Sequence, residues 1–159
     1  MTSYLYVAVV WLNHKAAFKR IHSIDWGLHC ANMGVLSTTA LLPFPTTVIA
    51  NAVQHGHPAD SRTAVGLYAL IGALLCVSWL AFFHYLSRHP DLVEAEVTEG
   101  FFPRERTRAL AGVALYVTAG VLGYLIAPAV ALVIFLALPV FYAITSEGLY
   151  ELPAVVRRR

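Results

Sequence analysis

Long uncharged runs separated by short charged segments dominate the pattern of this chain. Residues 26–53, 63–87 and 109–146 contain no Asp, Glu, Lys or Arg. About 20 apolar residues in a helix cross a bilayer, so each of the first two runs predicts one spanning helix. The third run is long enough for two crossings, divided at the A-P-A turn of residues 127–129. The pattern therefore predicts full spans over residues 26–53, 63–87, 109–127 and 129–146.

The N-terminal run is shorter than the others. Residues 1–12 are uncharged, and as a helix they would rise only ~18 Å, against ~30 Å of hydrocarbon. The basic segment 13–25 carries Lys15 and Lys19 on one helix face, and we expect it to continue the same helix to the bilayer surface. The prediction is an all-α integral membrane protein: a single transmembrane helical domain, 1–159, with a partial span over about 1–23 before the four full spans.

Composition leads to the same class of protein. Hydrophobic residues make up 58% of the chain and charged residues 13%, whereas soluble domains have about 25% charged residues. A chain of 159 residues is too small to hide so much apolar surface from water, and it is too apolar to be disordered. Cys30 and Cys76 both lie in apolar runs, so we expect two buried thiols and no disulfide framework. The expected surroundings are a lipid bilayer.

The basic residues predict an orientation. Alternating crossings place segment 13–25, loop 88–108 and the C-terminal tail on one side, and the polar loop 54–62 on the other. Every Lys and Arg except Arg62 then lies on the first side, which is cytoplasmic by the positive-inside rule. We therefore expect a multi-pass protein of the cell membrane with a cytoplasmic C-terminus. Pro90 and Pro103 predict helix breaks within the loop 88–108.

Polar residues follow one face of the span 26–53. Asn32, Thr39 and Thr46 recur every seven residues, and Ser37 and Thr38 add hydroxyls beside them. Two explanations stay open: hydrogen bonds within and between helices, or a face that contacts an ion path or a polar partner helix.

A second feature of the same span is the run that contains Pro43, Phe44 and Pro45. The two prolines remove two backbone donors, so the helix must bend or unwind there. Either a structural kink or an irregular backbone that lines a cavity would satisfy this pattern.

Other candidate chemistry is sparse. His14 follows Trp11 by three residues, on the same helix face, and its position predicts a hydrogen-bonded packing residue. His55, His57 and Asp60 lack further ligands, so no metal site is predicted, and a metal or proton transporter is only a distant alternative. The chain has no nucleophile elbow, phosphate loop or H-E-x-x-H motif, so we predict no enzyme and no cofactor. The basic residues border the membrane and predict no nucleic-acid partner.

Two motifs resemble a known family. W-L-N-H-K-A-A-F at residues 11–18 and L-L-P-F-P-T at residues 41–46 resemble the bacterial branch of the potassium channel family known in animals as the endosomal and lysosomal channel transmembrane protein 175. The resemblance implies six-span subunits that form tetramers and carry a potassium leak current without a carbonyl-lined filter. It also implies that a set of motif residues packs against the pore-lining helix: Trp11, Asn13, His14 and Phe18.

The chain departs from this family at its start. The family's first helix lines the pore and carries an R-x-x-x-F-S-D motif, which is absent here, and Met1 aligns inside the second helix. The pore-lining residues are therefore not assigned. The prediction is a potassium-permeable, leak-type channel subunit, incomplete as given, that forms a homo-oligomer with potassium as the permeating ion. The alternative is a non-conducting accessory or assembly subunit, whose Trp11, His14 and Thr38 side would bind a helix from another membrane subunit.

Overall fold

A computed structural model describes residues 2–95, 97 and 100–145 of the chain, and this part is helical. Its elements are α1 (Thr2–Phe18), α2 (Trp26–Leu41), α3 (Pro43–His55), α4 (Pro58–Arg88), the short 3-10 helix η1 (Pro90–Leu92), α5 (Phe101–Leu125) and α6 (Pro128–Ile144). The β-structure in these residues is one isolated antiparallel bridge between Ile21 and Val93. The predicted all-α class is confirmed.

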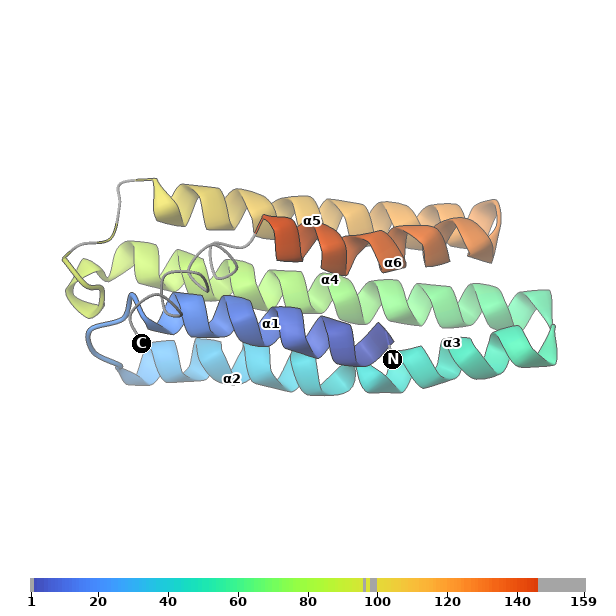
Figure 1. Cartoon of the computed structure of the whole chain (residues 1–159), viewed down its shortest axis with the longest axis horizontal. Helices are drawn as coiled ribbons and strands as arrows, with labels where there is room; N and C mark the ends of the chain where they lie inside the picture. The colour runs from blue at the N-terminus through green and yellow to red at the C-terminus, as the bar shows by residue number, and fades with distance from the viewer. Residues whose placement is uncertain (1, 96, 98–99, 146–159) are drawn as a thin grey trace, which may run out of the picture.

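Helix α4 forms the middle of the molecule (Figure 1). It packs against α2 and α3 on one side and against α5 on the other, and α6 packs against α5. Helix α1 lies across the face of these layers and contacts α6. The residue pattern of α4 explains its place, because its buried side chains extend from Ala64 to Leu86 and face both neighbouring layers.

Three helical stretches are long and apolar enough to cross a membrane: Trp26–Gln54, Pro58–Arg88 and Phe101–Leu125. Helix α6 is shorter, at 17 residues, which corresponds to a rise of about 26 Å. The protein is therefore a multi-pass membrane protein with at least these three candidate spans in its described part. The count of four full spans and one partial span stays a prediction.

The polar segment 54–62 is largely helical instead of forming the expected loop. Helix α3 continues to His55, and α4 already begins at Pro58. Gly56 ends α3 with a left-handed φ of 73° and donates its N–H to the carbonyl of Ala52. Pro58 then occupies the first turn of α4, where a missing N–H costs nothing. The residues at these two helix ends are polar, as the residues of a loop are. For this reason the sequence predicted a loop here.

The prediction of a helix break at Pro103 was wrong. A helix does end before Pro90, because α4 ends at Arg88. Helix α5 begins at Phe101, after Gly100 in the left-handed region, and Pro103 lies in its first turn. The N–H groups of a first turn have no partner within the helix, so proline fits there. Residues 101–108 of the predicted loop are therefore helical, and this places Glu105 and Arg108 inside the bundle.

The proline run interrupts the second span only locally, as a short break in hydrogen bonding. Helix α2 ends at Leu41 and α3 begins at Pro43, while Leu42 keeps helical torsions and donates its N–H to the carbonyl of Thr39 at 3.2 Å. The two helices follow each other nearly in line along one edge of the molecule (Figure 1). The predicted interruption is thus confirmed, and it takes the form of a tightened turn around the buried Leu42.

Asp25 fixes the start of α2 against α4. Its Oδ1 accepts a hydrogen bond from the N–H of Leu28 at 2.7 Å, and the hydroxyl of Tyr85 on α4 donates to its Oδ2. The Tyr85 hydroxyl and the Leu28 N–H together hold the pKa of Asp25 below its usual value, because both stabilise the carboxylate. This cap sets the position of α2 beside α4 and α1.

Candidate functional site

Helix α1 presents two different sets of aromatic and polar side chains to its neighbours. Trp11, His14 and Phe18 are three and four residues apart, so they share the face that meets α2 and α4. Tyr6 and Asn13 lie on the face toward α5 and α6. The candidate site therefore consists of two clusters that α1 separates.

The first cluster surrounds His14. Its Nε2 lies 2.8 Å from Oδ1 of Asn32 on α2, in a hydrogen bond between two helices. Its ring stacks on Phe18 with centroids 4.3 Å apart, and the ring of Trp79 on α4 meets it edge-on at 6.2 Å. Trp11 covers it from outside at 6.0 Å and stays 62% exposed. We call Trp11, His14, Phe18, Asn32 and Trp79 the His14 cluster.

The structure thus brings four of the predicted site residues together: Trp11, His14, Phe18 and Asn32. Asn13 does not join them, because it points to the opposite side of α1 and donates its side-chain amide to the carbonyl of Val9 at 3.0 Å. That these residues pack against a pore helix stays a prediction.

The hydroxyls of the second span bond mainly to their own helix. Thr39 donates to the carbonyl of Val35 at 2.7 Å, and Thr46 donates to Leu42 at 2.9 Å. Thr38 donates to Gly34 at 2.8 Å and lies 3.5 Å from the hydroxyl of Ser78 on α4. These contacts agree with the hydrogen-bonding explanation of the seven-residue pattern.

The other predicted residues of the second span divide between its two faces. Ser37, Pro43 and Phe44 are exposed on the outer face of α2 and α3, away from the His14 cluster. Pro45 is buried on the inner face. The residues grouped by sequence therefore do not form one surface.

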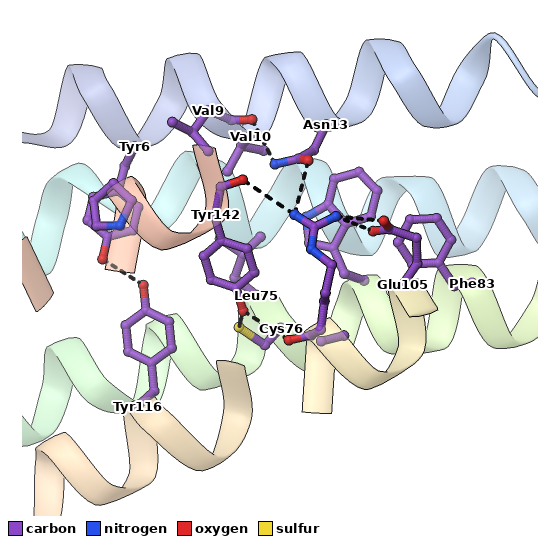
Figure 2. A pocket seen from close by; sticks show the side chains of 14 residues that line it. Tyr6, Val9, Val10, Asn13, Leu75, Cys76, Phe83, Glu105, Tyr116 and Tyr142 are labelled. Carbon is purple, nitrogen blue, oxygen red and sulfur yellow. Dashed lines mark hydrogen bonds and ion pairs between the residues drawn. The ribbon is translucent and has the colours of Figure 1, made fainter. Parts of the chain in front are cut away.

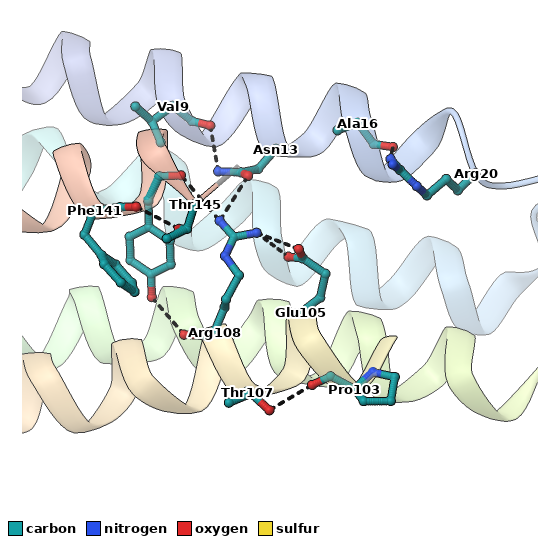
Figure 3. Close-up of polar contacts among 11 residues, drawn as sticks. Val9, Asn13, Ala16, Arg20, Pro103, Glu105, Thr107, Arg108, Phe141 and Thr145 are labelled. Carbon is teal, nitrogen blue, oxygen red and sulfur yellow. Dashed lines mark hydrogen bonds and ion pairs between the residues drawn. The ribbon is translucent and has the colours of Figure 1, made fainter. Parts of the chain in front are cut away.

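The second cluster is a buried ion pair that connects three helices. Arg108 Nη1 lies 2.6 Å from Glu105 Oε1 on the same turn of α5, and Glu105 is only 8% exposed. Arg108 Nη2 also donates long hydrogen bonds to Asn13 Oδ1 of α1 at 3.5 Å and to the carbonyl of Tyr142 of α6 at 3.4 Å (Figure 3). Burying a charge requires such partners, and here they come from α1, α5 and α6.

Two further groups of hydrogen bonds lie beside this ion pair and farther along the bundle (Figure 2). The hydroxyl of Tyr142 donates to the carbonyl of Arg108 at 3.4 Å and lies 3.3 Å from Cys76 Sγ. Farther along, Tyr116 donates to the hydroxyl of Tyr6 at 2.9 Å, and Tyr6 donates to the carbonyl of Phe135 at 2.7 Å. These groups line a cavity of about 60 Å³ among α1, α4, α5 and α6.

The chemistry of both clusters is that of helix positioning. The buried polar atoms are mostly bonded to one another, which fixes the register of helices in a membrane. In the described part of the chain, no three His, Cys, Asp or Glu side chains gather as a metal site. His57 and Asp60 are exposed, and the side chain of His55 lies outside the described residues.

Sequence reasoning missed the second cluster. It placed Glu105 and Arg108 in a cytoplasmic loop, and it did not select Tyr6, Tyr116 or Tyr142. One signal was present: Glu105 and Arg108 are three residues apart and directly precede an uncharged run, which is the spacing of an ion pair on one helix face.

Comparison with known proteins agrees with the resemblance seen in the motifs. A family model described as the endosomal/lysosomal potassium channel TMEM175 matches residues 1–43, which hold α1, α2 and the first residue of α3. A protein of Streptomyces collinus described as a potassium channel is 26% identical over 97 residues, which is 61% of this chain and 46% of that protein. The chain thus spans about half the length of this curated relative. No solved structure matches the chain.

Proposed function

We propose that the chain is a subunit of a potassium-permeable, leak-type cation channel of the cell membrane. The observation that carries this proposal is the match of the potassium channel family model to residues 1–43. The same stretch contains Trp11, His14, Phe18 and Asn32, which meet in one cluster. The similarity to a Streptomyces protein described as a potassium channel also supports it.

The packing of a single chain supports an oligomeric channel. The polar groups between α1, α4, α5 and α6 bond to each other, and the cavity among them is about 60 Å³, with mostly apolar walls. A potassium ion crossing the bilayer needs a continuous series of oxygen ligands or water. In this proposal the ion path therefore lies between copies of the chain or against a further helix. A homo-oligomer, a tetramer by resemblance, provides that arrangement, and potassium is the permeating ion with no cofactor.

The proposed orientation places the end of the molecule that holds Lys19, Arg20 and Arg88 in the cytoplasm. The connection 19–25 and residues 89–95 lie at that same end, and the turn at 56–57 near Arg62 lies at the other (Figure 1). This distribution of charge supports the orientation by the positive-inside rule.

Flux through reconstituted liposomes tests the proposed function. Purified protein is inserted into potassium-loaded vesicles, and an outward potassium gradient is used to drive uptake of a reporter cation. Potassium-dependent uptake above that of empty vesicles is expected, with valinomycin giving the full signal in both. The assay is done with this chain and with the protein produced from the longest in-frame coding sequence. If both form folded oligomers and neither carries potassium, the result would contradict the proposal and favour the accessory subunit.

A further inference from the structure

The guanidinium of Arg108 has one edge that its protein partners use weakly. Its Nη1 donates to both carboxylate oxygens of Glu105, at 2.6 and 2.7 Å. Its Nη2 reaches Asn13 Oδ1 only at 3.5 Å and the carbonyl of Tyr142 at 3.4 Å, which are long for hydrogen bonds. Its Nε is buried and has no hydrogen-bond partner among the residues that the structure describes. Because leaving a buried donor unbonded costs free energy, this group favours a ligand with an acceptor atom.

Arg108 lines the cavity of about 60 Å³ among α1, α4, α5 and α6. Glu105 and Asn13 contribute further polar groups to the same wall (Figures 2 and 3). Most of the remaining wall is apolar and includes Val9, Val10, Leu75 and Phe83. A few polar groups that orient a ligand, set in an apolar wall, are typical of a small-molecule site.

The volume of the cavity limits the size of its ligand. A water molecule occupies about 30 Å³ in the liquid, and a cavity of about 150 Å³ in another protein binds benzene. By the same scale, a cavity of about 60 Å³ takes two water molecules or one compound of about two or three non-hydrogen atoms.

The charges around the cavity limit its chemistry. Arg108 and Glu105 neutralise each other, so an anion or a cation would add an uncompensated charge to a buried site. A neutral ligand avoids this cost. A hydroxyl group fits best, because its oxygen can accept a hydrogen bond from Arg108 Nε while its O–H donates to an acceptor such as Asn13 Oδ1.

We propose that this cavity is a binding site for small neutral hydroxyl compounds, either two water molecules or one short alcohol. The oxygen of the ligand bonds to the guanidinium of Arg108, and the methyl group of an alcohol contacts the apolar wall. The site lies within one chain, so the proposal depends neither on potassium conduction nor on association of copies.

A second, smaller cavity offers a route to the site. It measures about 10 Å³, close to the space that one water molecule needs. Asn13, Glu105 and Arg108 line it as well, so the two cavities meet at the ion pair. Its other walls include Arg20 and Phe101, at the end of the bundle where α1 ends and α5 begins. We expect small hydroxyl compounds to enter from this end.

The thiol of Cys76 reports on the cavity because it forms part of the wall. Cys30→Ser leaves Cys76 as the sole thiol of the chain, and its S–H stretching band lies in an infrared window free of other protein bands. Protein in liposomes is transferred to D2O, and conversion of S–H to S–D is followed. The control is Val65→Cys in a Cys30→Ser/Cys76→Ala background, because Val65 is buried but does not line the cavity. We expect Cys76 to exchange about tenfold faster or more, because a dry thiol exchanges only when the helices open.

Alcohols test the second kind of ligand on the same band. Methanol is expected to shift the S–H band of Cys76 to a saturating value, whereas tert-butanol exceeds the cavity and should leave the band unchanged. Glu105→Gln/Arg108→Met removes the donor without leaving a buried charge. In this variant methanol should bind about tenfold more weakly or worse, because a hydrogen bond from a charged group is lost. Circular dichroism checks that each variant is folded.

Ala109→Val tests the cavity by filling it. Ala109 is buried and lines the cavity, so two added carbons take up most of the space. This variant should slow thiol exchange and abolish the methanol shift, whereas Ala114→Val, at an exposed position of the same helix, should change neither.

The outcomes identify the ligand or overturn the site. Fast exchange without a methanol shift assigns the site to water, and a methanol shift without fast exchange assigns it to an alcohol. The proposal is overturned if Cys76 exchanges no faster than Val65→Cys and methanol has no effect, or if tert-butanol acts as methanol does. A folded Ala109→Val protein that behaves as the parent does would also overturn it. Where that variant does not fold, the comparisons of the two thiols and of the two alcohols still decide.

Discussion

His14 connects three helices through one side chain. It bonds to Asn32 of α2 and its ring contacts Trp79 of α4, while Phe18 of its own helix stacks on it. Replacing His14 by Ala removes a hydrogen bond and aromatic contacts, which are worth about 1–3 kcal/mol together. We expect His14→Ala to lower the stability of the protein and of its assembly in detergent, measured by thermal unfolding and size-exclusion chromatography, more than it changes ion selectivity.

The matched control is a histidine outside the His14 cluster. His29 is exposed, and its ring stacks on the exposed Trp26 at the start of α2. His29→Ala is expected to unfold within a few degrees of the wild type. Combining His14→Ala with Asn32→Ala measures the bond itself, for which a coupling of about 0.5–1.5 kcal/mol is expected. Strictly additive effects would show that the two side chains do not interact.

The Glu105–Arg108 pair predicts an asymmetric response to substitution. Arg108→Met leaves the carboxylate of Glu105 buried without its partner, and this situation costs about 3–5 kcal/mol. The double substitution Glu105→Gln/Arg108→Met leaves no buried charge and should recover part of that loss. Thermal unfolding of the three proteins in one detergent checks the order wild type, double variant, Arg108→Met.

An arginine at the other end of the bundle controls for loss of charge alone. Arg62 is exposed in the first part of α4, so Arg62→Met should change stability by less than about 1 kcal/mol. If Arg62→Met and Arg108→Met were equally destabilising, the buried network would not be the cause.

These residues show how far sequence reasoning reaches. The shared face of Trp11 and His14 follows from helical spacing alone, and the motif that contains them identified the family they resemble. The burial of Glu105 depends on α1 lying across the start of α5, which is a contact between segments distant in sequence. The charges around Glu105 are those of an exposed loop, and the three-residue spacing to Arg108 indicates an ion pair without indicating that the pair is buried.

At the scale of helices, close approach around Gly123 holds α5 between α4 and α6. A Cβ atom at Gly123 would lie 2.6 Å from Cβ of Ala131 on α6 and 2.6 Å from Cγ1 of Val65 on α4. Atoms cannot approach so closely, so Gly123→Ala must push two helices apart, at a cost of about 1–3 kcal/mol. We expect a lower unfolding temperature for this variant in detergent.

Gly66 of α4 offers the same substitution without the contact. No heavy atom lies within 4 Å of a Cβ at Gly66, so Gly66→Ala should leave stability unchanged or raise it slightly through helix propensity. A destabilisation equal to that of Gly123→Ala would show that loss of glycine flexibility, and not helix packing, is responsible.

Helix positions were more predictable than helix ends. The uncharged runs predicted the positions of α4, α5 and α6, and of α2 and α3 together as one span, because the bilayer requires long apolar segments. The ends differed where polar residues continue a helix beyond the membrane, as at Pro58 and Phe101. A proline in the first turn is compatible with a helix, so Pro103 marked the start of α5 and not a break.

At the scale of the whole molecule, the basic residues predict which end faces the cytoplasm. Ser23 lies exposed in the connection between α1 and α2, and His57 lies exposed in the turn between α3 and α4. Each is replaced by Cys in a Cys30→Ser background, and intact spheroplasts are treated with a membrane-impermeant maleimide. His57→Cys should react from outside, whereas Ser23→Cys should react only after permeabilisation, because basic segments are retained in the cytoplasm. The reverse labelling would invert the orientation, and equal labelling of both from outside would mean that copies insert both ways.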